Sequence, residues 1–394
     1  MKNKIILAAL SLLTYSSCTL DSVNELRVEN AETAISKPEI TGFSPALSAN
    51  EAEVLNWLIN IQQENGLLTS TEDSNMVSLY DNSLAALVFL SIGEIDKAEK
   101  ILDYFNGKID SEFIPNEGGF FQFRDKTGNN GSTIWLGDNA WLLIALNNHQ
   151  KVTGDTKYDR LRSILENWIR SLQDIDGGLW GGYRENGRQI HKITEGIITA
   201  FNAVQGYDQF HKDLLEYLER ERWDTKEELL IAWPENPDHY FALDLHSLGY
   251  LIFEGLSEDV LYKADRYKNT QISEHNGNEI SGYCFDEDKD VIWLEGTAQI
   301  ALAFQKASNT KEANFLLDEI KKSQIEGLEK SSSKGVPYAT NHGSSYGTSM
   351  LWSHASNRPA LSSSIWYLFS SMNYNPLEIE RQKNIPEEDK FWVQ

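Results

Sequence analysis

Five short stretches of the sequence each place one carboxylate at or near the start of an apolar run. They are Tyr80-Asp81-Asn82, Gly137-Asp138-Asn139, Thr194-Glu195-Gly196, Leu243-Asp244-Leu245 and Leu294-Glu295-Gly296. Paired carboxyl groups are the groups that cleave glycosidic bonds: one donates a proton to the leaving oxygen, and the other acts as base or nucleophile. The proton donor needs a raised pKa, which burial among aromatic side chains provides.

Asp138 and Glu295 are the leading candidates for this chemistry. Asp138 lies between Trp135 and Trp141, and Glu295 follows Trp293 by two residues. Asp81 and Glu195 are the next candidates. A simpler interpretation stays open for each residue alone, because Asp and Glu are favoured at helix N-termini as caps and by the helix dipole.

The spacing of these carboxylates predicts the elements that must position them. Successive members lie roughly 50 to 60 residues apart, enough for two antiparallel helices and their loops. Repeats of that length are typical of stacked helical hairpins. We therefore expect twelve helices, at residues 48–64, 81–92, 95–105, 138–152, 157–172, 193–204, 208–220, 241–253, 256–268, 294–307, 311–326 and 361–371, with 270–292 as a polar loop.

The connections between these helices are asymmetric. The link after each acidic-start helix is short and contains Gly93, Gly154, Gly206, Gly255 or Ser308-Asn309. The link before each such helix is mostly long and rich in glycine and aromatic residues. This arrangement places the long loops on one face, where functional residues gather over a rigid scaffold.

The twelve-helix alternation, the acidic helix starts and the aromatic loops together resemble the six-hairpin (α/α)6 toroids of many glycoside hydrolases and some polysaccharide lyases. The resemblance covers about residues 48–372 and matches no single glycoside hydrolase family. It implies an all-α toroid domain over residues 47–375, followed by a C-terminal strap at 376–394. It also implies that the even-numbered helices form an inner ring with the substrate mouth at their N-terminal ends. Such folds host several chemistries, so the resemblance does not fix the reaction.

Aromatic side chains in the long loops are candidates for stacking on sugar rings. Packing within the loops is the alternative for each of them. The candidates are Phe120, Trp135, Trp180, Tyr183, Trp233, Trp293, Tyr338, Tyr346 and Trp352.

Metal and cofactor sites are not expected. Asp238-His239 with Asp244 and His246 matches no established zinc spacing, which favours hydrogen-bonded structural histidines. The acidic run at residues 286–290 lacks the pattern of a calcium loop and indicates a solvated turn.

The net charge and the N-terminal sequence limit which partners and which cellular location are expected. A formal net charge of -24 over 394 residues disfavours nucleic acid and anionic lipid surfaces. Lys2 and Lys4, a short apolar run and Ser16-Ser17-Cys18 resemble a bacterial lipobox, with an ordinary signal peptide as the alternative. We expect a lipoprotein signal peptide at 1–17, lipidation of Cys18, a tether at 18–46 and a place in the bacterial cell envelope. Cys284 then stands alone, so no structural disulfide is expected.

These observations predict an envelope-anchored carbohydrate-active enzyme, in the first place a glycoside hydrolase acting on an oligo- or polysaccharide. A polysaccharide lyase is the enzymatic alternative, and it would need a cation or amide to neutralise a uronic acid. The residues considered for that role are Arg124, Arg184, Arg188 and Asn341. A non-catalytic glycan-binding lipoprotein is the alternative from another class.

Overall fold

The computed structural model describes residues 47–234, 240–328, 333–342, 344–346, 349–351, 358–381 and 383–393. They all lie in one compact unit, Ile40–Gln394. The predicted signal peptide, Cys18 and the tether lie outside the described residues, as does Trp352.

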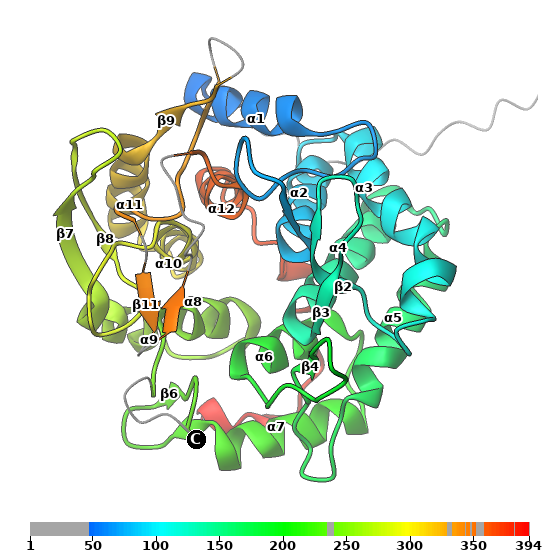
Figure 1. Cartoon of the computed structure of the whole chain (residues 1–394). Helices are drawn as coiled ribbons and strands as arrows, with labels where there is room; N and C mark the ends of the chain where they lie inside the picture. Colours follow the sequence, from blue (N-terminus) through cyan, green and yellow to red (C-terminus); the bar gives the residue numbers. More distant parts are fainter. Residues whose placement is uncertain are drawn as a thin grey trace, which may run out of the picture. The chain divides into compact units, whose positions relative to one another are not determined.

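The described helices form two concentric layers (Figure 1). The inner layer consists of α2 (Leu79–Ser91), α4 (Leu136–Thr153), α6 (Thr194–Ala203), α8 (Leu243–Ile252), α10 (Leu294–Lys306) and α12 (Leu361–Ser371). The outer layer consists of α1 (Ala49–Ile61), α3 (Ile95–Gly107), α5 (Asp159–Ser171), α7 (Gln209–Glu221), α9 (Asp259–Lys263) and α11 (Thr310–Ser323). Each inner helix contacts the next, and α12 contacts α2, so the ring closes. The predicted (α/α)6 toroid is confirmed.

The sequence pattern distinguishes the two layers. Outer helices are amphipathic: α5 buries Leu161, Leu165 and Trp168 and leaves its charged face in water. Inner helices are buried almost all round, as α2 is from Asp81 to Ser91. An all-round apolar helix needs neighbours on every side, and the double ring supplies them.

The short turns between paired helices depend on left-handed backbone conformations. Gly93, Gly154, Gly206 and Gly255 have φ between 69° and 84°, and Ser308 has φ 63°. Glycine adopts this conformation without strain from a side chain, which is why it commonly ends helices. The five predicted short turns therefore lie where the sequence placed them.

The long links carry small antiparallel sheets. A four-stranded rim sheet joins β1 (Met76–Ser78), β2 (Phe121–Asp125), β3 (Ser132–Trp135) and β4 (Gly182–Tyr183). Two-stranded pairs join β5 (Trp223–Asp224) with β6 (Leu229–Leu230), β9 (Ile325–Glu326) with β10 (Lys334–Gly335), and β11 (Ser344–Tyr346) with β12 (Ser349–Leu351). Each described strand lies between an outer helix and the next inner helix, so the strands occur in the predicted long links.

One expectation about these links was wrong. Residues 270–292 are not simply a polar loop, because β7 (Lys268–Ile272) pairs with β8 (Glu279–Tyr283). Polar side chains on the open face of this hairpin hid the strands: the hydroxyls of Thr270 and Ser281 lie 2.8 Å apart across it. Such cross-strand polar pairs stabilise a sheet without an apolar pattern.

The C-terminal strap crosses the ring at the C-terminal ends of the inner helices. Asn148 and Asn202 donate from their Nδ2 atoms to the carbonyls of Pro376 and Leu377, at 3.3 and 3.1 Å. Farther along, the Trp392 indole donates to the carbonyl of Glu254 at 3.1 Å. The strap therefore packs on the face opposite the long loops.

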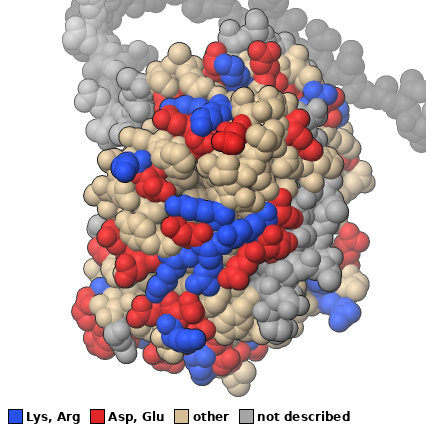
Figure 2. Space-filling view, turned by 90° about the vertical axis from the view of Figure 1, so that its left-hand side faces the viewer, with Lys and Arg blue, Asp and Glu red and all other residues tan. Residues whose placement is uncertain are grey.

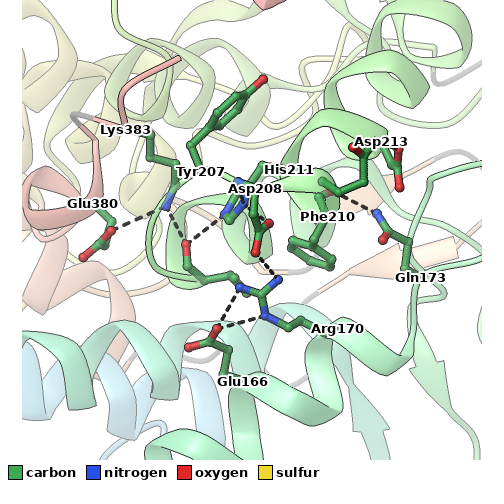
Figure 3. A network of polar contacts seen from close by, with 12 residues as sticks. Glu166, Arg170, Gln173, Tyr207, Asp208, Phe210, His211, Asp213, Glu380 and Lys383 are labelled. Atoms are coloured by element: carbon green, nitrogen blue, oxygen red, sulfur yellow. Dashed lines mark hydrogen bonds and ion pairs between the residues drawn. The ribbon is translucent and has the colours of Figure 1, made fainter. Parts of the chain in front are cut away.

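A polar network fixes the middle of the strap (Figure 3). Lys383 lies beside Glu380, and its Nζ donates to the carbonyl of Val204. His211 contacts the same carbonyl through Nε2 at 3.1 Å and contacts Asp208 through Nδ1 at 2.8 Å. Burial lowers the pKa of Lys383 to about 8. The network ties the strap to the turn between α6 and α7.

The outer surface mixes charges of both signs, as Figure 2 shows for the side that carries α11 and the β7–β8 hairpin. Lys268 pairs with Asp265 at 2.8 Å and with Glu312 at 3.0 Å. Such partly exposed pairs contribute about 0–1 kcal/mol each, so they solubilise this face more than they stabilise it. Within the described residues, no helix is both long enough and apolar enough to cross a membrane.

Candidate active site

One pocket of about 320 Å³ lies at the N-terminal ends of the inner helices. Five carboxyl side chains line it, one from each of five inner helices: Asp81, Asp138, Glu195, Asp244 and Glu295. The structure thus brings all four predicted catalytic candidates together. It adds Asp244, whose stretch matched the sequence pattern but which received no catalytic role. The sixth inner helix, α12, contributes the hydroxyl-bearing Ser362 instead.

The carboxylates occupy the second or third position of their helices rather than the N-cap. The N-cap residues are Ser78, Trp135, Ile193, Ala242 and Trp293. Only Ser78 caps its helix through its side chain, which accepts from the backbone N–H of Asp81 at 3.3 Å. N-capping therefore does not explain why the inner helices begin with acids.

Glu195 is positioned by a hydrogen bond from Thr199 and faces Gly137. Its Oε1 accepts from Thr199 Oγ1 at 3.0 Å, and a Cβ built on Gly137 would lie 2.9 Å from its Oε2. Burial raises the pKa of Glu195, while the Thr199 hydroxyl and the Trp141 indole hold that pKa down. The Thr199 hydrogen bond favours the ionised form of Glu195 and opposes part of the effect of burial.

The charge of Glu195 acts on its neighbours. Burial raises the pKa of Asp138 well above its usual range, and the Glu195 carboxylate raises it further. Burial and then the charge of Glu195 raise the pKa of Asp244 to about 7. Both effects favour the protonated form of Asp138, and among the described side chains it accepts one long hydrogen bond, from Gln122 Nε2 at 3.4 Å. A neutral acid with spare hydrogen-bonding capacity can donate a proton to a bound molecule.

Glu295 is held by hydrogen bonds. The Tyr80 hydroxyl donates to its Oε1 at 2.6 Å, and Gln299 Nε2 donates to the same oxygen at 3.3 Å. Tyr80 in turn accepts from the Trp366 indole at 2.8 Å. Burial still raises the pKa of Glu295 to about 7, against the opposing effect of Tyr80 and Ser362.

Asp81 is the most isolated member of the set. It is 3% exposed, and its Oδ2 has no hydrogen-bond partner among the described residues. Burial raises the pKa of its carboxyl group to about 8. A buried polar atom without a partner carries a desolvation cost, which a ligand hydroxyl in the pocket would relieve.

The predicted aromatic residues divide between the pocket and other places. Trp293 and Tyr338 line the pocket, together with four rings that the sequence analysis did not assign as substrate contacts: Tyr80, Phe123, Trp141 and Phe285. Tyr80 and Trp141 lie beside acidic residues of the sequence pattern, so their positions could have predicted that they line the pocket. The positions of Phe123 and Phe285 could not have done so.

The other aromatic candidates that the structure describes do not line this pocket. Lys192 lies 4.9 Å from the ring centre of Trp180, and Trp233 stacks on His191 at 5.0 Å. Trp135 is the N-cap residue of α4, and Tyr183 lines a separate groove. Phe120 is loop core, packed against Phe105 and Phe113. The side chain of Tyr346, like all of Trp352, lies outside what the structure describes.

The described residues that line the pocket include no lysine, arginine or histidine. Arg124, considered for neutralising a uronic acid, is instead buried in an ion pair with Glu112 at 2.8 Å. Arg184 and Arg188 are exposed beyond β4, and Asn341 accepts from the backbone of Glu274 at 3.1 Å. Among the described residues, the pocket lining therefore offers no positive charge to an anionic ligand.

Of the residues considered for a metal site, Asp244 lines the pocket and His246 does not. His246 Nδ1 lies 2.7 Å from the carbonyl of Val260, and burial lowers its pKa to about 4. It is therefore a neutral, hydrogen-bonded structural residue, whereas His239 lies outside the described residues. In the described part of the chain, no group of three or more His, Cys, Asp or Glu side chains is arranged to hold a metal ion.

Solved structures of sugar-processing enzymes share this fold at low sequence identity. A cellobiose 2-epimerase from Bacillus thermoamylovorans B4167 superposes with a TM-score of 0.56 at 12% identity, covering 82% of this chain and 97% of that chain. A glycosidase in complex with glucose gives 0.55 at 13%, covering 83% and 97%, and a D-mannose isomerase gives 0.53 at 11%, covering 85% and 100%. No protein-family model matches the chain, and a search of curated proteins found no match. At these identities the likeness establishes the fold.

Proposed function

We propose that this protein is a carbohydrate-active enzyme that hydrolyses a glycosidic bond in the carboxyl-lined pocket. The observation that supports the proposal is the convergence of five buried carboxyl groups from five inner helices, with hydrogen bonds that favour ionisation of two of them, Glu195 and Glu295. Hydrolysis requires one protonated and one ionised carboxyl group at the same bond.

In the proposed reaction, Asp138 donates its proton to the glycosidic oxygen as the bond to the anomeric carbon breaks. Glu195, ionised, either attacks that carbon or removes a proton from the water that does. If Glu195 attacks, water then cleaves the resulting sugar ester while Asp138 takes back a proton from that water; if Glu195 acts as base, its new proton is lost to solvent and Asp138 regains one. In either path one water is consumed, and the products are a sugar with a new reducing end and the departing alcohol. Glu295, held by Tyr80 and Gln299, binds a substrate hydroxyl, and it is the alternative partner of Asp138.

The charge of the pocket constrains the substrate. Among the described lining residues, no side chain offers a positive charge to a uronic acid, and the Glu195 carboxylate would repel one. We therefore propose a neutral oligo- or polysaccharide as substrate. The polysaccharide lyase alternative is disfavoured for the same reason.

A sugar epimerase or isomerase is the second candidate, because similarly folded proteins include a cellobiose 2-epimerase and a D-mannose isomerase. That chemistry removes a proton from a carbon beside a carbonyl group, and Glu195 would be the base. It also needs an acid to open the sugar ring and to return the proton, and Asp138 would be that acid, so the carboxyl pair supports this candidate as well as hydrolysis.

Product analysis by NMR separates the candidates in one experiment. The protein is incubated with neutral oligosaccharides, and the sugars are followed over time. New reducing ends indicate hydrolysis, and an epimer or ketose at constant chain length indicates isomerisation. An unsaturated sugar from a uronate-containing control indicates a lyase, and retention of sugars without any product indicates a binding protein.

We also propose that the enzyme is anchored to the bacterial cell envelope through a lipid on Cys18. The support is the basic and apolar N-terminal pattern ahead of Ser16-Ser17-Cys18. Incorporation of a fatty-acid probe by the wild type, and its loss in Cys18→Ser, would support this location. Equal labelling of both proteins would count against it.

A further inference from the structure

A second groove lies on the rim sheet, outside the carboxyl-lined pocket. Its volume is about 480 Å³, and its lining includes Asn116, Phe121, Thr133, Ile134, Tyr183 and Arg184. These residues come from the loop before β2, from β2 and β3, and from the hairpin that begins with β4. The groove thus belongs to the same sheet whose first two strands contribute to the pocket.

Strand β2 joins the groove to the pocket. Cross-strand partners share a face, as do residues two apart on a strand. Ser78 pairs with Phe123, and both line the pocket. Two residues from Phe123, Phe121 pairs with Ile134, which pairs with Tyr183. Gln122, on the opposite face of β2, also lines the pocket, and Ile134 is buried, so the two sites adjoin through β2 itself: Phe121 lines the groove, and Gln122 and Phe123 line the pocket.

The side chains that line the groove suit a neutral sugar. Phe121 and Tyr183 are half-buried rings, each with part of its surface open to solvent. Such rings stack on the C–H faces of sugars, while the Asn116 amide and the exposed Arg184 can hydrogen-bond to hydroxyl groups. The groove and the pocket thus offer complementary contacts for consecutive units of one chain.

The groove is rigidly built. Phe121 donates from its backbone N–H to Glu112 at 2.9 Å, and its carbonyl accepts from Arg124 at 2.9 Å. Arg124 and Glu112 form a buried ion pair with each other, so both backbone groups of Phe121 are fixed. Thr133 has φ 56°, which is uncommon for a β-branched residue and is strained by roughly 1–3 kcal/mol. Strain of this kind is retained where the surrounding structure imposes a defined shape.

We propose that this groove binds the sugar units that follow the one held in the pocket, so that the substrate is an oligosaccharide of several units. This inference rests on the proposed function of the pocket. Tyr183 and Phe121 are the stacking residues, and the rim sheet is the path between the two sites. By strand geometry Tyr183 lies about 12 Å from Phe123, a distance that a few sugar units span.

Binding measurements on the full-length Asp138→Asn protein test the inference without turnover. The probes are neutral cello-, manno-, xylo- and chito-oligosaccharides of two to six units, titrated by calorimetry. In the series that binds, we expect affinity to rise about tenfold as the chain lengthens from two units to four or five. In the double variant that carries Asp138→Asn and Tyr183→Ala, affinity should no longer rise with chain length. Its affinity for the two-unit sugar should stay unchanged.

Two variants control for loss of the ring and for general damage. Tyr183→Phe keeps the stacking surface and should retain the gain with length. Tyr262→Ala removes a tyrosine of α9 that is 45% exposed and distant in sequence from the rim sheet, and it should behave like its parent. Circular dichroism verifies that each variant is folded.

The results separate the inference from the function on which it rests. Equal affinity for all chain lengths, or an affinity that still rises with chain length in Tyr183→Ala, would overturn the groove as a binding site. The proposed function of the pocket would be unaffected. Absence of binding by any oligosaccharide overturns the proposed function and the inference together.

Discussion

The Tyr80 hydroxyl donates a hydrogen bond of 2.6 Å to Oε1 of Glu295, although the two residues are 215 positions apart in the chain. Tyr80 belongs to α2 and Glu295 to α10, with α12 between them in the ring, and Trp366 of α12 donates to the Tyr80 oxygen at 2.8 Å. Three inner helices are thus connected through two hydrogen bonds at the edge of the pocket. The position of the Glu295 carboxyl group therefore depends on closure of the ring.

Tyr80→Phe should raise the pKa of Glu295 above its present value of about 7, because the Tyr80 hydrogen bond favours the ionised form. Carbon-detected NMR of glutamate carboxyl groups would follow this titration. Tyr262→Phe, on the exposed side of α9, is the matched control and should leave it unchanged. An unaltered Glu295 titration in Tyr80→Phe would show that burial alone sets its pKa.

Asp138→Asn and Glu195→Gln should each lower turnover by about a hundredfold to ten-thousandfold, the usual contribution of a positioned acid or base. Asp96→Asn is the control, since Asp96 lies in the first turn of the outer helix α3 and is exposed. Full activity combined with lower thermal stability would mean that these carboxyl groups stabilise their helices and take no part in catalysis. A larger loss in Glu295→Gln than in Glu195→Gln would assign the ionised role to Glu295.

Glu295→Gln should stabilise the folded protein at pH 8 more than at pH 5. The pKa of Glu295 is raised from 4.5 to about 7 by folding, so between these values the folded state retains a proton that the unfolded state has released. Stability therefore falls as pH rises through this window, by at most about 3 kcal/mol. Urea unfolding at both pH values measures it, with exposed Glu279→Gln as control. Equal effects of Glu295→Gln at the two pH values would contradict the raised pKa.

Gly137→Ala should reduce activity with little loss of helix. The new Cβ would lie 2.9 Å from Oε2 of Glu195, so the carboxylate must move. At Gly107, the last residue of α3, a Cβ would meet nothing within 4 Å, and alanine there should be neutral or slightly stabilising. Kinetics of the two variants side by side measure the difference. Normal activity in Gly137→Ala would show that the position of Glu195 is not critical.

Trp392→Ala should destabilise the protein by about 3–5 kcal/mol, the usual cost of removing a buried tryptophan. Its ring centre lies 4.7 Å from that of Phe253, and its indole donates to the Glu254 carbonyl. Thermal unfolding measures the effect, and Val393→Ala, at a residue that is 52% exposed, is the control. A loss no larger than that of the control would mean that the strap adds nothing to the ring.

The sequence predicted what depends on local patterns. Twelve helices follow from apolar periodicity and turn residues, and the four carboxylates follow from their places at helix starts. Contacts that form when the ring closes could not be predicted from local sequence patterns. The Tyr80–Glu295 hydrogen bond, for example, joins helices far apart in the chain. Arg124 was considered as a ligand-neutralising cation because nothing near it in sequence revealed its pairing with Glu112 through the fold. The β7–β8 hairpin was missed because its polar face has no apolar alternation.

The inner helices and the C-terminal strap together determine how molecules reach the carboxyl groups. In the described part of the chain, the inner helices are buried beyond their first turns and the strap packs on their C-terminal ends, so the pocket is a well rather than a tunnel. A polymer cannot thread through such a well, so only its terminus reaches the bottom. Whatever is cut off must leave by the opening through which the chain arrived. The proposed hydrolase would therefore shorten chains one end-cut at a time, and release of the small product would have to precede the next insertion.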